Sequence, residues 1–174
     1  MGWIDPGLVI GGLLGGFTMG LTGMGGGALL TPMLVLVFGV SPTAAVGSDL
    51  VTSLAVKPFG GAIHARAGTV RWDLVRWLSL GSVPGALAGV TLLHAVGAGA
   101  DELVKIMLGF TLLAAAAVMV WRARNPVPDH VGPPTPVRPI PTVALGLIGG
   151  TVVGLTSVGS GSLMIAVLTL LYPK

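Results

Sequence analysis

A glycine-rich stretch that occurs twice decides the expected fold. Residues 12–36 read GLLGGFTMGLTGMGGGALLTPMLVL, and residues 146–170, at one offset without a gap, read GLIGGTVVGLTSVGSGSLMIAVLTL. Glycine clusters interrupt helices, and membrane proteins built from duplicated halves often carry interrupted helices at corresponding positions. The sequence therefore predicts an internal repeat with one interrupted membrane element in each copy.

The composition around the two copies is that of a membrane protein. Of the 174 residues, 53% are hydrophobic and 9% are charged, whereas soluble domains carry about 25% charged residues. The chain has no cysteine, which excludes a disulfide framework, thiolate chemistry and a cysteine zinc site.

Five hydrophobic elements are expected, and all should be helical because the apolar runs are continuous and do not alternate. They cover residues 6–38, 43–63, 73–95, 102–121 and 141–172. The fold class is thus an all-α polytopic membrane protein with about five transmembrane elements, the first and fifth broken by glycine-rich motifs. We favour a single crossing of each interrupted element over a re-entrant hairpin, and we expect a parallel internal repeat in either case.

The charges gather in the breaks between these elements. All six arginines lie in two segments, 64–76 and 122–140, while Asp101 and Glu102 lie in a third break. The positive-inside rule places both arginine segments in the cytoplasm of a multi-pass cell (inner) membrane protein. The net charge of +3 reflects this topology, and no basic stripe with interleaved aromatics predicts a nucleic-acid partner.

Small residues recur four apart in three places, which predicts close helix packing and no chemistry. The three glycine stripes are Gly12, Gly16 and Gly20; Gly81, Gly85 and Gly89; and Gly146, Gly150 and Gly154.

The interrupted segments are also the candidate substrate site. A broken helix leaves backbone N–H groups without partners, and successive N–H groups at a half-helix form an anion-binding nest. Threonine and serine hydroxyls would add donors. The alternative is that the glycines only permit close packing at a kink. The candidate binding residues are Thr22, Gly23, Gly25, Gly26 and Gly27 in the first copy and Thr156, Ser157, Gly159, Ser160 and Gly161 in the second.

Two ionisable residues lie inside the second element, where a charge is costly unless it faces a cavity or a partner. Lys57 is a candidate counter-charge for the anion, and Asp49 is a candidate coupling residue that relays a proton or a cation. They lie about 12 Å apart along a helix, too far for a direct pair, so each needs another partner. Pro58 predicts a break in this helix. The alternative is that both charges snorkel to water from the ends of the span.

Enzyme chemistry is not expected. His64, His94 and His130 lie in different breaks without metal-ligand spacing, and no nucleophile–base pair or nucleotide-binding loop occurs. We therefore predict no catalytic residue, metal or cofactor.

A set of motifs resembles the TauE/SafE sulfite exporter family: GLTGMGGGALLTP (20–32), SP (41–42), AVG (45–47), HARAGTV (64–70) and GSVPG (81–85). The resemblance implies a polytopic inner-membrane protein with duplicated halves that exports sulfite, sulfonates or related anions, with coupling to protons. The expected partners are the lipid bilayer and a small anion. A passive anion channel and a non-transporting membrane scaffold are the alternatives.

The domain division follows from this resemblance. Residues 1–124 form a first repeat of four membrane elements, 125–141 a proline-rich cytoplasmic linker and 142–174 the start of a second repeat. Counterparts of the second, third and fourth elements do not follow, so we expect a fragment of a longer carrier or a truncated product. Transport by this chain alone would then require a homo-oligomer.

Overall fold

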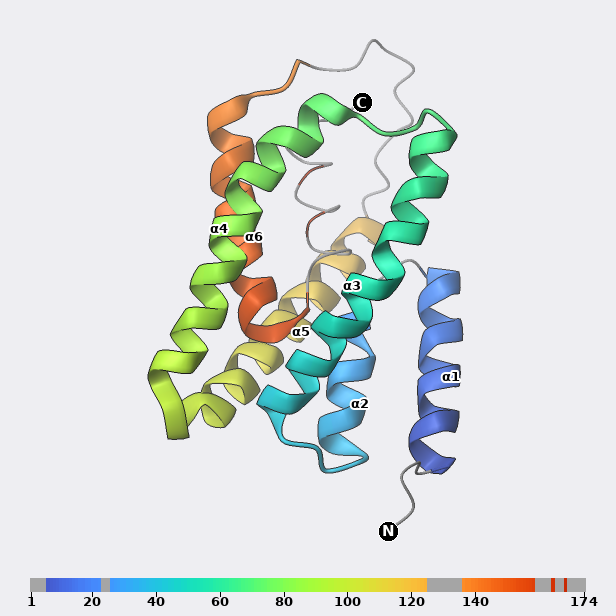
Figure 1. Ribbon diagram of the computed structural model, residues 1–174, viewed down its shortest axis with the longest axis vertical. Coiled ribbons are helices and arrows are strands. Elements are labelled where there is room, and N and C mark those ends of the chain that lie inside the picture. Colours follow the sequence, from blue (N-terminus) through green and yellow to red (C-terminus); the bar gives the residue numbers. More distant parts are fainter. Residues whose placement is uncertain (1–5, 23–25, 125–135, 159–163, 165–167, 169–174) are drawn as a thin grey trace.

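The computed structural model describes residues 6–22, 26–124 and 136–158, together with Met164 and Leu168 (Figure 1). The described residues are helical and contain no strand, which agrees with the predicted all-α class. The elements are α1 (Pro6–Thr22), η1 (Gly26–Ala28), α2 (Leu30–Leu36), α3 (Pro42–Arg66), α4 (Trp72–Val96), η2 (Gly97–Gly99), α5 (Ala100–Arg124) and α6 (Pro139–Thr156).

The first interrupted element is a hairpin. Gly11 of α1 lies against Phe38, beyond the end of α2, and Gly15 lies against Leu30 at the start of α2, so the two helices are antiparallel. The chain returns to the end of the molecule at which α1 begins (Figure 1). The single crossing that we favoured from the sequence is therefore wrong for this element.

The hairpin also changes the relation between the two copies. α1 and α6, the helices that lead into the two matching motifs, run in opposite directions (Figure 1). The predicted parallel relation is therefore wrong for these two helices. An opposite orientation of this kind is common in the repeats of membrane carriers. Met164 packs against Gly149, the same pair of positions as Leu30 and Gly15 in the first copy.

Three long helices form the rest of the first copy. α3, α4 and α5 each contain 25 residues, about 37 Å of helix, which exceeds the ~30 Å hydrocarbon core of a bilayer. α3 begins at Pro42, as the Ser-Pro pair predicts, and continues through Pro58, so the predicted break there is wrong.

The proline-rich linker ends earlier than we predicted. α6 begins at Pro139, because the first turn of a helix tolerates prolines that have no N–H to donate, and residues 139–141 are thus helical. Residues 125–135 of the linker lie outside the described residues.

α4 and α6 pack as parallel helices through two interlocking glycine stripes. A Cβ atom on Gly81, Gly85 or Gly89 would overlap a carbonyl oxygen of α6, and one on Gly146, Gly150 or Gly154 would overlap a carbonyl oxygen of α4. The carbonyls that they meet belong to Val143, Leu147, Thr151, Leu78, Ser82 and Ala86. Tight packing is thus confirmed for two of the three predicted stripes. Among the described residues, nothing lies within 4 Å of a Cβ built on the third, Gly12, Gly16 and Gly20.

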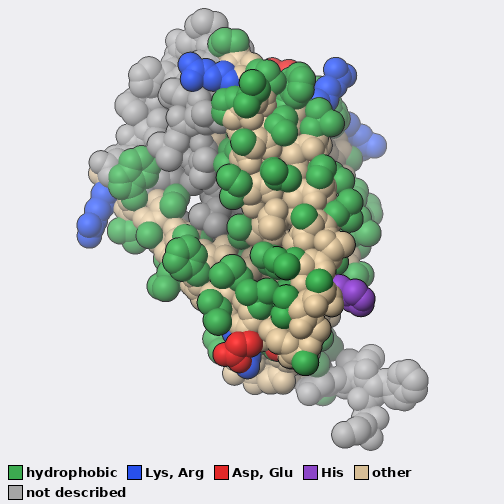
Figure 2. Space-filling view, turned by 90° about the vertical axis from the view of Figure 1, so that its left-hand side faces the viewer, with side chains coloured by type: hydrophobic (Ala, Val, Ile, Leu, Met, Phe, Trp, Pro, Cys, Tyr) green, Lys and Arg blue, Asp and Glu red, His purple; other side chains and the backbone are tan. Residues whose placement is uncertain are grey.

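Large apolar side chains point outward, and small residues fill the interior. Exposed fractions reach 73% for Leu21 and 75% for Phe59, whereas the glycines of the α4–α6 interface are buried. Figure 2 shows apolar side chains over much of the described part of the face that it views, with Lys and Arg side chains toward its upper end. This distribution suits a lipid solvent. Within the described ranges one helix, α6, is long and apolar enough to cross a membrane by length and composition. The number of crossings stays a prediction.

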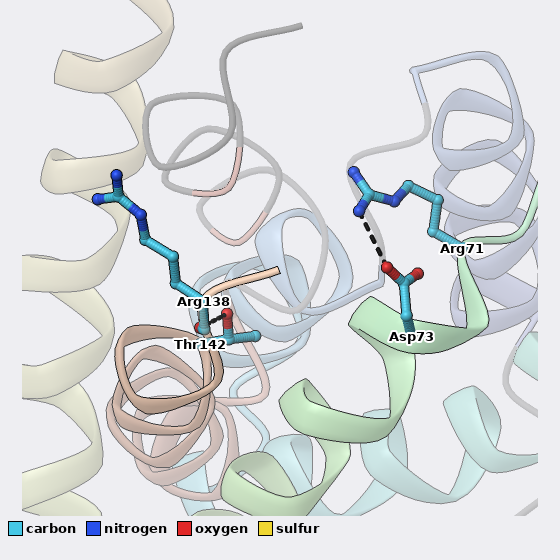
Figure 3. Close-up of polar contacts among 4 residues, drawn as sticks. All are labelled: Arg71, Asp73, Arg138 and Thr142. Atoms are coloured by element: carbon cyan, nitrogen blue, oxygen red, sulfur yellow. Dashed lines mark hydrogen bonds and ion pairs between the residues drawn. The ribbon is translucent and has the colours of Figure 1, made fainter. Parts of the chain in front are cut away.

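The charged side chains mark the two ends of the molecule. At one end, Arg71 before α4 donates a hydrogen bond of 3.0 Å to Asp73, and Arg138 stands at the start of α6 (Figure 3). At the other end, Asp101 in the first turn of α5 accepts hydrogen bonds from Thr43 of α3. Arg71 and Arg138, one from each arginine segment, therefore lie at the same end of the molecule, and the assignment of both segments to the cytoplasm stays a prediction.

Candidate functional site

The two glycine motifs meet in the interior of the molecule. A Cβ atom on Gly27 of η1 would overlap the carbonyl group of Ser157 and the backbone nitrogen of Val158, which directly follow α6. The residue after the first break and the residues after α6 thus approach to backbone contact, which only a residue without a Cβ atom permits. We call Gly27, Asp49, Thr156, Ser157 and Val158 the glycine junction.

α6 ends at the glycine junction in a left-handed residue. Ser157 has φ 60°, and its N–H donates to the carbonyl of Val153 at 2.7 Å. The hydroxyl of Thr156 donates to the carbonyl of Val152 at 2.7 Å and accepts the Val158 amide at 3.2 Å. Glycine usually occupies such a position, and the corresponding residue of the first copy is Gly23. Unlike glycine, the serine at this left-handed position carries a hydroxyl group that can donate a hydrogen bond.

The Ser157 hydroxyl donates to Oδ2 of Asp49 in α3. Both side chains are buried, with Asp49 at 2% exposure, so the snorkelling alternative is wrong for Asp49. Oδ1 of Asp49 has no hydrogen-bond partner in the described structure. A buried carboxylate with one unpartnered oxygen is costly, and a bound proton or small cation would remove that cost. The pair therefore links a titratable group of the first copy to the backbone break of the second.

Thr31 of α2 is a second buried polar group that the sequence did not single out. Its side chain is fully buried, and its Oγ1 has no hydrogen-bond partner among the described residues. In the sequence, the only sign of this buried group is the hydroxyl of Thr31 within an otherwise apolar run. That signal is weak because a helical threonine usually donates to the carbonyl four residues earlier, as Thr142 and Thr151 do here.

Lys57 occupies a different place along α3. It lines a groove of about 450 Å³ with Leu50, Ser53, Leu54 and Pro58. Asp49 lies about 12 Å from Lys57 along α3, and its neighbour Leu50 is among the residues that line the groove. A cation in a largely apolar groove is a suitable counter-charge for an anion.

The remaining predicted residues are only partly described. Thr22 is the last residue of α1, and Gly26 is the first of η1. Gly23, Gly25, Gly159, Ser160 and Gly161 lie outside the described residues, so the anion nest stays a prediction. In the described ranges no group of three His, Asp or Glu side chains could hold a metal ion. His64 and His94 are exposed in the last turns of α3 and α4.

The chain has clear relatives among curated proteins. It is 40% identical over 164 residues to "Probable membrane transporter protein YjnA" of Bacillus subtilis (strain 168), which covers 90% of this chain and 64% of the relative. It is 31% identical over 160 residues to "Probable membrane transporter protein" of Xylella fastidiosa (strain 9a5c), covering 91% of this chain and 59% of the relative. The chain thus spans less than two thirds of the length of these relatives.

No solved structure matches the chain. The family model described as "Sulfite exporter TauE/SafE" matches residues 8–174, which is nearly the whole chain and includes both glycine motifs. The chain therefore belongs to the sulfite exporter TauE/SafE family.

Proposed function

We propose that this chain forms part of a membrane transporter that exports small sulfur-containing or organic anions, such as sulfite or sulfonates, and couples export to protons. The relatives named as probable membrane transporters and the family itself support transport. The groove beside Lys57 supports an anionic substrate. We also propose that the chain lies in the cell membrane and that its two arginine segments face the cytoplasm.

One observation carries the proposal, the contact between Asp49 and Ser157. It joins a buried carboxyl group on α3 to the end of α6, where the two glycine motifs touch. Protonation of Asp49 would remove the cost of burying its charge and change the hydrogen bond to Ser157. A proton bound there would favour one arrangement of the two copies, which is what coupling requires.

Lys57 supplies the second half of the proposal. The ammonium group of Lys57 is exposed and lines the groove, so it offers a positive charge to an anion that enters there. Pro58 leaves the carbonyl of Leu54 without its usual intrahelical donor, so the wall of the groove also offers a backbone acceptor for a protonated anion such as bisulfite.

The test is sulfite uptake into proteoliposomes that contain the full 174-residue chain, with and without a pH gradient. We expect Lys57→Gln to lower uptake by at least 10-fold while insertion and folding persist. Lys105→Gln, which changes an exposed lysine in the second turn of α5, is the matched control and should keep the activity.

Three results would contradict the proposal. If the Lys57→Gln variant takes up sulfite as the unmodified chain does, Lys57 is not part of the substrate site. Currents proportional to voltage and indifferent to the pH gradient would indicate a passive anion channel. Failure of the folded chain to bind sulfite, beside a longer relative that does bind it, would indicate a membrane scaffold.

A further inference from the structure

Two buried oxygen atoms of the first copy have no hydrogen-bond partner in the described structure. They are Oδ1 of Asp49 in α3 and Oγ1 of Thr31 in α2. The exposed fraction is 2% for Asp49 and 0% for Thr31, so neither residue is open to bulk solvent. A buried polar atom without a partner destabilises the folded state, so each of the two requires an explanation.

Thr31 and Asp49 lie at the same level of two helices in contact. α2 and α3 pack against each other and run in opposite directions from the turn at Gly39 (Figure 1). Thr31 comes about eight residues before this turn and Asp49 about ten after it, a difference of about 3 Å along a helix. Gly27, one turn before Thr31, lies against the carbonyl of Ser157, whose hydroxyl donates to Asp49. Thr31 therefore borders the glycine junction, to which Asp49 belongs.

The hydroxyl of Thr31 bonds neither to its own helix nor to Asp49. A helical threonine usually donates to the carbonyl four residues earlier, but this hydroxyl has no partner among the described residues. A hydroxyl in contact with a carboxylate oxygen would form a strong hydrogen bond, and Oδ1 of Asp49 receives none. Packing does not demand the hydroxyl either, since the second copy has Ile165 at the matching position. Two buried oxygens that border one junction without bonding to each other suit a common partner between them.

We propose that Oδ1 of Asp49 and Oγ1 of Thr31 bind a sodium ion at the glycine junction. In membrane carriers, sodium ions lie beside interrupted helices and at the C-terminal ends of half-helices. α6 ends here at Thr156, so the negative end of its dipole lies at the site. The Ser157 hydroxyl holds Oδ2, which leaves Oδ1 for the ion. One carboxylate suits a monovalent cation better than Ca²⁺, whose sites gather several carboxylates.

The charges around the pair also favour a cation. Within their bounds, η1, α2 and α6 carry no ionisable side chain. Lys57 is exposed and lies about 12 Å from Asp49 along α3. α5, which also packs against α3, carries Asp101, Glu102 and the exposed Lys105 in its first two turns. A cation bound at the junction would neutralise the buried carboxylate directly.

The inference shares Asp49 with the proposed function, because a proton and a sodium ion are alternative partners of one carboxylate. It rests on that function only for the use of the ion in coupling, since binding needs no anion substrate. Sodium binding and sulfite uptake can therefore be measured separately.

The test measures the binding of radioactive sodium to the full chain in detergent micelles, with unlabelled sodium chloride or choline chloride as competitor. We expect saturable binding that sodium displaces and choline does not. Thr31→Val keeps the shape of the side chain, removes the hydroxyl and should weaken binding by at least about 10-fold, and Thr31→Ser should restore it. Thr52→Val, which removes an exposed hydroxyl of α3 that donates to the Ser48 carbonyl, is the matched control and should bind sodium normally.

The stability of the same variants gives a second measurement. The SDS unfolding midpoint of the unmodified chain should rise when sodium replaces choline at constant ionic strength, because an ion that binds only the folded state stabilises it. Thr31→Val should fold, since it removes a buried hydroxyl without a described partner. In choline it should be at least as stable as the unmodified chain, and its midpoint should not respond to sodium.

The absence of sodium binding would overturn the proposal. Binding that Thr31→Val leaves unchanged would overturn it too, because the ion would then lie on Asp49 without Thr31. A midpoint that Thr31→Val lowers equally in sodium and in choline would assign the hydroxyl to a buried water and also overturn it. A chain that takes up sulfite without binding sodium contradicts this inference alone, and one that binds sodium without taking up sulfite contradicts the proposed function alone.

Discussion

Glycine acts differently in two regions of this molecule. Between α4 and α6 it removes side chains so that two intact helices approach, and the carbonyls it meets remain in regular helices. At the glycine junction it lets Gly27 approach Ser157 and Val158, where α6 has ended and a buried carboxyl group accepts a hydrogen bond. The same residue type thus supports stability in one region and the candidate chemistry in the other. Substitutions should therefore distinguish the packing role of glycine from its role at the candidate site.

The largest effect is expected in the α4–α6 interface. Gly150→Leu would drive a side chain into the backbone of Ser82, which cannot move without separating the helices. We expect a loss of about 3 kcal/mol or more, enough to prevent recovery of folded protein. The measurement is SDS-induced unfolding in mixed micelles.

Gly109→Leu in α5 is the control for this substitution. Gly109 faces open space among the described residues, so leucine should gain about 0.5–1 kcal/mol of helix propensity. If the Gly150→Leu variant folds as well as the Gly109→Leu variant, the interlocking of α4 and α6 is contradicted.

The next largest effect is expected at the glycine junction. In Gly27→Ala the new methyl group would overlap the Ser157 carbonyl and displace the end of α6. The expected loss of stability is about 1–3 kcal/mol, with insertion intact and anion uptake abolished. Gly47→Ala, at an open position of α3, should gain about 0.5–1 kcal/mol of helix propensity and leave uptake unchanged. Normal uptake by a folded Gly27→Ala variant would show that the contact between the motifs serves packing alone.

A smaller and more selective effect is expected at Ser157. Ser157→Ala leaves Asp49 Oδ2 without its donor, at a cost of about 1–3 kcal/mol. Ser157→Gly loses the same hydroxyl but relieves a left-handed backbone, which recovers about 1 kcal/mol. We therefore expect both variants to lose the dependence of uptake on the pH gradient, and the glycine variant to be the more stable. A pH dependence that persists in both would remove Ser157 from the coupling site.

The helix-packing part of the fold could be predicted because it is local in sequence. Residues spaced by four share a helix face, so the stripes that begin at Gly81 and Gly146 identify an interface without any knowledge of the topology. The start of α3 at Pro42 is equally local. The stripe of Gly12 has the same spacing and no neighbour in the described structure, which shows that spacing identifies a surface and not its partner.

The topology could not be predicted because it depends on whether the chain reverses direction within the first apolar run. An apolar run from 6 to 38 is long enough for one interrupted crossing or for a hairpin, and only the contacts of Gly11 and Gly15 with the α2 segment separate the two. The direction of α6 relative to α1 depends on that choice, so the expectation of a parallel repeat in either case is wrong. The pairing of Asp49 with Ser157, 108 residues away, likewise requires the fold.

The smallest effect is expected at a contact remote from both glycine regions. Asp101, at the hydrophilic end of α5, accepts the hydroxyl of Thr43 at 2.7 Å and its amide at 3.0 Å. These hydrogen bonds hold the pKa of Asp101 below its usual value. Because the folded-state pKa is lowered, the stabilisation is fully present above the usual pKa of about 4 and is lost as the pH falls through the lowered value.

Asp101→Asn should therefore lower the SDS unfolding midpoint slightly at neutral pH, by less than Ser157→Ala does. The difference from the unmodified chain should shrink as the pH falls below about 4, because the carboxyl group of the unmodified chain then becomes neutral as well. Glu102→Gln, which changes the exposed neighbouring carboxylate, provides the control. A difference that stays constant down to pH about 2 would show that the charge of Asp101 contributes nothing to the link between α3 and α5.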